Sequence, residues 1–221
     1  MKNVLKLLFL LLFGLLSAVP QSHAETKRIL AVGNSFSYDA ILQELLPVVR
    51  SGGDDILVGF PYKGGTTLRL HWQYITENEK IYNYYTIKDG KTSSTGAASR
   101  CFDKDIIASE PWDVVVIQTD HNYSGDYSQY FPYLDNLIAY LREHLTNKEA
   151  EFFLYMTWAY QDGSSKMLEL VNQGLYQDQT DQYAKITDCV PRAAGRAVKN
   201  RDDQGRVVHH VPVSPEHTVG G

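Results

Sequence analysis

The feature that most constrains the fold of this chain is a succession of short apolar runs separated by amphipathic segments. Continuous apolar runs occupy residues 29–32 and 114–117, and two further strand-like runs occupy residues 56–60 and 152–157. Runs of this length are typical of strands buried on both faces. Alternating strands and helices predict an α/β fold, a three-layer sandwich whose mainly parallel sheet is covered by helices on both faces.

The first 24 residues are typical of a secretory signal peptide. Lys2 and Lys6 precede an apolar run at residues 7–16, and Ser22 and Ala24 are small residues at the cleavage-site positions. The run is short for a membrane-spanning helix, although a retained anchor is the alternative interpretation. We therefore expect residues 25–221 to form one domain that is secreted or periplasmic, with no membrane contact after cleavage.

Charge and cysteine content exclude several classes of protein. The chain has a formal charge of −5, which becomes −7 when the segment with Lys2 and Lys6 is removed, and it has no basic stripe. Nucleic acid is therefore not an expected partner. The two cysteines, Cys101 and Cys189, could form a disulfide or remain buried thiols. Zinc-binding spacings such as CxxC and HExxH do not occur, so no metal and no cofactor is predicted. The sequence does not indicate the oligomeric state.

Ligands of parallel sheets bind beyond the carboxyl ends of the strands, which directs attention to the turns after Val32, Phe60, Ile117 and Thr157. The first turn places Ser35 just before a predicted helix, for which we expect Asp39 to be the cap. A serine at such a turn can attack a carbonyl while its own N–H holds the oxyanion. Alternatively, the segment is only a turn.

Four segments, taken in order, resemble the SGNH (GDSL-like) hydrolase superfamily, and more closely an uncharacterised secreted family with a GNSFS signature. The resemblance covers roughly residues 28–190. The matching segments are residues 33–37 (GNSFS), 65–72 (GTTLRLHW), 112–118 (WDVVVIQ) and 156–160 (MTWAY).

The resemblance implies an SGNH/flavodoxin-like fold and a set of site residues. Ser35 would be the nucleophile and an oxyanion donor, and Gly65 would give the second N–H. The superfamily's third donor is an Asn side chain, for which Gln118, or else Asn122, stands here. The implied activity is hydrolysis of an ester substrate, a small molecule or a carbohydrate bearing an acyl group.

Other polar and aromatic residues allow two interpretations. His71 beside Trp72 fits a structural histidine better than a pocket residue. Asp120 and His121 are interpreted as loop polarity, because adjacent residues rarely aim their side chains at one point. The tyrosines could form a sugar-stacking rim or belong to the core of the following helix; they are Tyr123, Tyr127, Tyr130 and Tyr133.

The C-terminal region departs from the superfamily. Its Asp-x-x-His block is missing after residue 190, residues 192–221 form an atypical tail, and we expect the fold to be incomplete at this end. Either His210 or His217 is an unusual base, or the protein is a non-catalytic exported carbohydrate-binding protein with a degenerate SGNH domain. We predict no complete Ser-His-Asp triad and weak or absent esterase activity.

Overall fold

The structure is a computed structural model that describes residues 26–199 and 208–211. The predicted signal peptide, His217 and much of the atypical tail lie outside the described residues.

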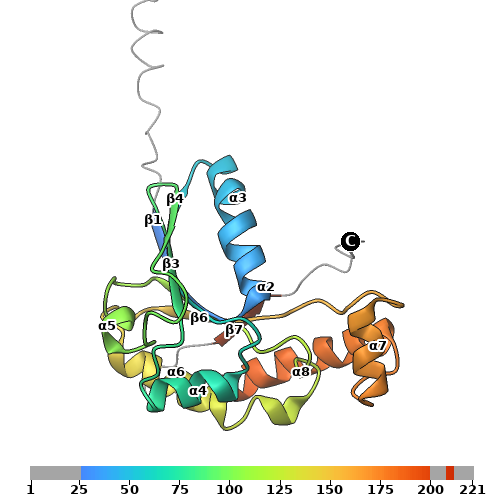
Figure 1. Cartoon of the computed structure of the whole chain (residues 1–221). Coiled ribbons are helices and arrows are strands. Elements are labelled where there is room, and N and C mark those ends of the chain that lie inside the picture. The colour runs from blue at the N-terminus through green and yellow to red at the C-terminus, as the bar shows by residue number, and fades with distance from the viewer. Residues whose placement is uncertain (1–25, 200–207, 212–221) are drawn as a thin grey trace, which may run out of the picture.

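A single twisted sheet is the centre of the fold (Figure 1). Its seven strands have the order β4-β3-β2-β1-β5-β6-β7. Strands β1, β2, β5, β6 and β7 pair in parallel, whereas β3 is antiparallel to both of its neighbours, β2 and β4. The mainly parallel sheet is therefore confirmed, and all four predicted strands belong to it. The strands are β1 (Thr26–Val32), β2 (Asp55–Tyr62), β3 (Asn83–Lys88), β4 (Lys91–Ser94), β5 (Val114–Ile117), β6 (Glu151–Tyr155) and β7 (Val208–Val211).

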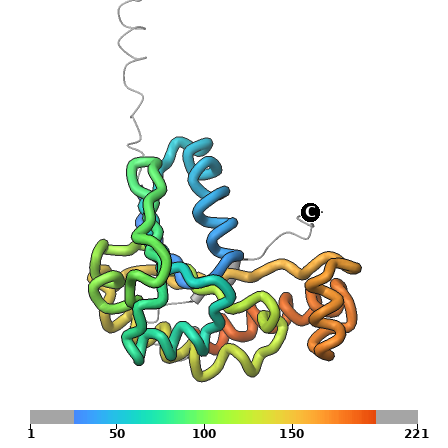
Figure 2. The backbone as a smooth tube through the Cα atoms, viewed as in Figure 1, coloured from blue at the N-terminus to red at the C-terminus, as the bar shows by residue number. Residues whose placement is uncertain are grey.

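Helices lie on both faces of the sheet. One face is covered by a continuous helical segment made of α2 (Ser35–Ser37), the π-helix η1 (Tyr38–Leu45) and α3 (Leu46–Ser51). The opposite face is covered mainly by α4 (Leu68–Thr76), α6 (Tyr133–His144) and α8 (Gln179–Lys199). Figure 2 shows the same separation along the backbone, with the blue helical segment on one side of the sheet and the red-orange α8 on the other. The shorter helices are α5 (Lys104–Ile107), the 3₁₀ turn η2 (Tyr127–Gln129) and α7 (Ser165–Asn172).

The two faces of the sheet bury separate cores because successive strand residues point to opposite sides. Leu30 and Val32 of β1 belong to the larger core with the side chains of α4, α6 and α8. Ala31, between them, belongs to the smaller core with Ile41 and Leu42 of η1. The three-layer sandwich expected from the sequence is therefore confirmed.

The helix cap expected from the sequence is wrong. The helical segment begins at Ser35, and Asn34 is its cap, because the Asn34 side chain accepts a hydrogen bond from the Phe36 N–H at 3.2 Å. The expected cap, Asp39, lies inside η1. The last helix, α8, contains Pro191 and runs through it from Gln179 to Lys199. Pro47 lies in the first turn of α3, and the continuous helical segment runs through it to Ser51.

Both cysteines are buried free thiols, so the disulfide alternative is wrong. The Cys101 thiol donates to the Asn78 carbonyl at 3.1 Å, and the Cys189 thiol donates to the Gly125 carbonyl at 3.2 Å. Among the residues that the structure describes, no helix is both long enough and apolar enough to cross a membrane.

Candidate active site

Ser35 and Gln118 lie at the same carboxyl edge of the sheet, as the sequence predicts. Ser35 follows β1 by three residues and opens α2, and Gln118 directly follows β5. The backbone N–H of Gln118 donates to the Val32 carbonyl at 2.8 Å, which joins the two strand ends. Ser35 is half-buried, and within residues 26–199 its hydroxyl has no hydrogen-bond partner.

The side chain of Gln118 holds the turn that contains Ser35. Its Oε1 atom accepts from the Asn34 N–H at 3.2 Å, the Ser37 N–H at 3.3 Å and the Ser37 hydroxyl at 2.8 Å. Its Nε2 atom donates to the Thr119 carbonyl, and the residue is fully buried. This geometry differs from the oxyanion-donor role that the resemblance implies, because the amide oxygen faces the turn and the amide nitrogen is bound to backbone.

Gly33 makes this packing possible. A Cβ at this position would lie 2.8 Å from Gln118 Oε1, and closer still to the Ser37 hydroxyl. Side-chain atoms do not approach this closely, so Ser37 and Gln118 can meet only because residue 33 is glycine. The hydrogen bond between Ser37 and Gln118 therefore accounts for both the glycine at the start of the GNSFS segment, Gly33, and the serine at its end, Ser37.

Asn34 joins three loops at the sheet edge. Besides capping α2, its Nδ2 atom donates to the Thr66 carbonyl at 3.2 Å and lies 3.4 Å from Asp120 Oδ2. Gly65 precedes Thr66 and has a positive φ of 66°, which favours glycine. The structure therefore brings the loops of Gly65 and Gln118 to the turn of Ser35.

Asp120 and His121 are part of this site, and their interpretation as loop polarity is wrong. Their exposed fractions are only 3 % and 8 %. The Asn122 N–H donates to Asp120 Oδ1 at 2.9 Å, an Asx-type turn that bends the chain away from strand geometry. In a bend, consecutive side chains need not point in opposite directions. His121 Nδ1 consequently lies 3.9 Å from Asp120 Oδ2.

An aromatic cluster joins the loops after β1, β5 and β6. Phe36 stacks on His121 at a centroid distance of 4.0 Å and on Trp158 at 4.3 Å. Tyr160 meets both Phe36 and His121 edge-on, and its hydroxyl is bonded to His121 Nε2. Sequence reasoning gave Trp158 and Tyr160 no role. Their position just beyond the carboxyl end of β6 was the available signal.

Burial keeps the histidines of this region neutral. It lowers the pKa of His121 to about 4, and the positive charge of Lys166 acts in the same direction. Burial also raises the pKa of Asp120, against the opposing effect of the Asn122 N–H. Burial lowers the pKa of His71 to about 3, which the nearby Gly33 backbone partly offsets.

The structure confirms His71 as a structural histidine. It is fully buried, its ring is stacked parallel to that of Tyr82, and its Nδ1 atom is 2.9 Å from the Tyr82 hydroxyl. Of the tyrosines that could form a sugar-stacking rim, Tyr130 is instead a core residue whose hydroxyl donates to the Ser124 carbonyl at 2.8 Å.

His210 lies on β7, in register with Leu154 of β6. Two strands, β5 and β6, separate β7 from β1. Three interstrand spacings place the backbone of His210 roughly 14 Å from β1. The role of His210 as a base stays a prediction, as do the catalytic roles of Ser35, Gly65 and Gln118.

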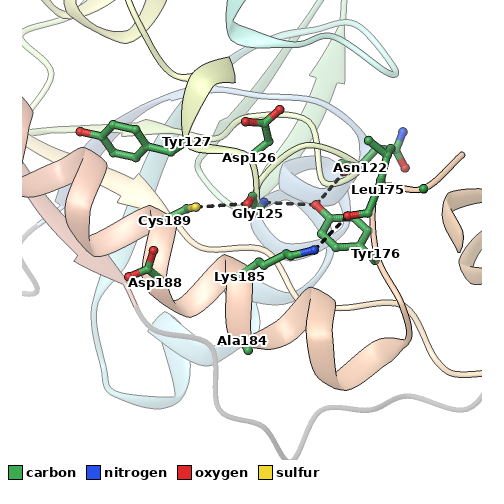
Figure 3. A pocket seen from close by; sticks show the side chains of 11 residues that line it. Asn122, Gly125, Asp126, Tyr127, Leu175, Tyr176, Ala184, Lys185, Asp188 and Cys189 are labelled. Atoms are coloured by element: carbon green, nitrogen blue, oxygen red, sulfur yellow. Dashed lines mark hydrogen bonds between the residues drawn. The ribbon is translucent and has the colours of Figure 1, made fainter.

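A cavity of about 550 Å³ lies beside this region, between the loop after β5 and α8 (Figure 3). Tyr176 closes one side, with its hydroxyl donating to the Asn122 carbonyl at 2.8 Å and accepting from the Gly125 N–H at 3.3 Å. Ser35 is not among the lining residues; Asn122 connects this cavity to the loop that contains His121.

Residues 28–199 match the domain of unknown function DUF4886. The chain belongs to the DUF4886 family. A DUF4886 protein from Bacteroides uniformis, known from a crystal structure, is 32 % identical and superposes with a TM-score of 0.70. The match covers 78 % of this chain and 64 % of the other, so this DUF4886 chain spans about two thirds of the length of that relative.

A second solved structure supports the fold of this DUF4886 protein. A candidate SGNH hydrolase from Slackia heliotrinireducens is 20 % identical, with a TM-score of 0.50 over 83 % of this chain and 78 % of that one. At this identity the likeness concerns the fold, which is SGNH/flavodoxin-like. A comparison with proteins of curated function finds no match.

Proposed function

We propose that this DUF4886 protein is an exported SGNH-type serine hydrolase that cleaves an ester, namely an acyl group on a carbohydrate. The observation behind the proposal is the position of Ser35. It opens a helix at the carboxyl edge of β1, in a turn to which the loops of Gly65 and Gln118 are bonded.

The mechanism begins with attack of Ser35 Oγ on the ester carbonyl. The N–H groups of Ser35 and Gly65 hold the negative charge that develops on the carbonyl oxygen. Gln118 keeps the turn in one conformation by accepting three hydrogen bonds from it. The alcohol then leaves with a proton, and water hydrolyses the acyl-serine in a second, similar step.

The aromatic residues beside Ser35 support a carbohydrate substrate. Trp158 and Tyr160 are half-buried, and both contact Phe36, which follows Ser35. Large rings with one exposed part can pack against the apolar C–H face of a sugar while their polar atoms bind its hydroxyl groups. Export is supported by the signal-like sequence of residues 1–24.

One observation favours a second candidate, a non-catalytic carbohydrate-binding protein. Across the described residues, no histidine nitrogen is bonded to the Ser35 hydroxyl, and Gln118 faces the turn instead of the substrate space. A binding protein could keep the aromatic cluster without an activated serine.

A serine-directed phosphonate probe tests the choice between the two candidates. The hydrolase predicts covalent labelling of the peptide containing Ser35, lost in Ser35→Ala and retained in Ser94→Ala, which changes an exposed serine of β4. Turnover of acetylated sugars should follow the same pattern. Calorimetric binding of an oligosaccharide without labelling or turnover would instead identify the binding protein.

A further inference from the structure

Asp120, His121 and Tyr160 form a chain of polar groups beside Ser35. The Tyr160 hydroxyl is bonded to His121 Nε2, and Asp120 Oδ2 lies 3.9 Å from His121 Nδ1. His121 Nδ1 is buried and has no hydrogen-bond partner in the described part of the chain. An unpaired buried nitrogen is costly, and the carboxylate beside it is the group that would stabilise it once the imidazole is protonated.

The three residues of this polar series contact the residues on both sides of Ser35. Asn34, immediately before it, meets Asp120 at 3.4 Å. Phe36, immediately after it, stacks on His121 and meets the ring of Tyr160 at a centroid distance of 6.2 Å. Tyr160 is half-buried while His121 is almost fully buried, so Tyr160 is the more exposed end of this series of polar residues.

We propose that Tyr160 is a further catalytic residue, which takes the Ser35 proton and passes its own proton to His121. The base is then supplied by the loops after β5 and β6, and the C-terminal Asp-x-x-His block of the superfamily is not needed. This inference rests on the proposed hydrolase function.

The protonation states fit this direction of transfer. His121 is neutral at neutral pH, and the proposal assigns its imidazole proton to Nδ1, on the side of Asp120, so that Nε2 accepts from the Tyr160 hydroxyl. A proton arriving at Nε2 makes an imidazolium whose charge is balanced by Asp120. Lys166 is the charged group that opposes this state.

The step is balanced in atoms and electrons. Ser35 Oγ forms a bond to the acyl carbon as its proton moves to the Tyr160 oxygen, and the proton of Tyr160 moves to His121 Nε2. The carbonyl electron pair moves to the oxygen held by the N–H groups. When that pair returns, the bond to the leaving alcohol breaks, and the alcohol regains the proton through Tyr160.

The rate at which a phosphonate probe labels Ser35 measures the activation of the serine without a known substrate. Tyr160→Phe and His121→Gln should each lower the labelling rate and kcat/KM by about 10²–10⁴, the contribution of a general base. The double variant should lose little more than either single variant, because the two residues act as one unit. Tyr183→Phe and His144→Gln, matched changes on α8 and α6, should leave both rates unchanged.

Unchanged labelling of Ser35 in Tyr160→Phe and His121→Gln would overturn this inference and leave the hydrolase proposal intact. Absence of labelling in the wild-type protein would overturn both. The pH profile of the wild-type rate needs no variant: a loss of rate near pH 4 is expected for His121, whereas a loss near 6.5, the ordinary histidine pKa, would indicate another base.

Discussion

Replacing Gly33 by alanine tests the packing of the serine turn. The new Cβ would lie 2.8 Å from Gln118 Oε1 and 2.9 Å from Ser37 Cβ, whereas ordinary contacts begin at 3.4 Å. Overpacking of this kind costs about 1–3 kcal/mol. Loss of the Ser37–Gln118 hydrogen bond adds about 1 kcal/mol. We expect a loss of about 2–4 kcal/mol in the free energy of unfolding, or a Tm lower by about 4–16 °C.

Urea unfolding followed by circular dichroism measures this loss. Gly195→Ala is the matched control, since its Cβ would meet nothing within 4 Å inside α8, and it should stabilise the protein by about 0.5–1 kcal/mol. Adding Ser37→Ala removes the closest contact, so the double variant should lose less than the sum of the two single variants. A Gly33→Ala protein within about 0.5 kcal/mol of wild type would refute the packing argument.

Three further predictions concern buried polar groups. Gln118→Leu leaves three buried donors of Asn34 and Ser37 without an acceptor, and should destabilise by about 3 kcal/mol or more in the same unfolding assay, where a loss below about 1 kcal/mol would contradict it. The free energy of unfolding should fall as pH drops from 6.5 toward 4, because burial lowers the pKa of His71 and His121 in the folded state while the same histidines bind protons in the unfolded chain. His71→Gln should flatten this pH dependence. A wild-type free energy that does not change over this pH range would contradict the prediction. A thiol reagent should modify the two cysteines only after unfolding, and a native mass unchanged by reduction would agree with free thiols.

The fold could be predicted from the sequence because its central strands are buried on both faces. Residues 29–32 and 114–117 are continuous apolar runs for that reason, whereas a strand with one face in water would alternate apolar and polar residues. The turn between β3 and β4 is made of Asp89 and Gly90, which both have a positive φ, and Asp-Gly is a residue pair that such a hairpin turn favours.

The site could be predicted only in part. The position of Ser35 follows from the end of β1, but the helix cap depends on where the backbone turns, which Asn34 and Asp39 suit equally by residue type. The contacts among His121, Phe36 and Tyr160 join three loops that are far apart in the sequence. No periodicity records such contacts, because they depend on how the strand ends are placed side by side.

The stacking of Phe36 on both His121 and Trp158 also governs how the ligand-facing edge can open. Phe36 belongs to the short helix α2, and His121 and Trp158 belong to the loops after β5 and β6, so none of these three segments can move outward without exposing rings of the others. The helix start and the two loops should therefore behave as one cooperative opening unit, with a common opening free energy in native-state hydrogen exchange. Substrate entry and product release would then depend on a concerted motion of the whole edge, and mutations in any one segment would change the dynamics of all three.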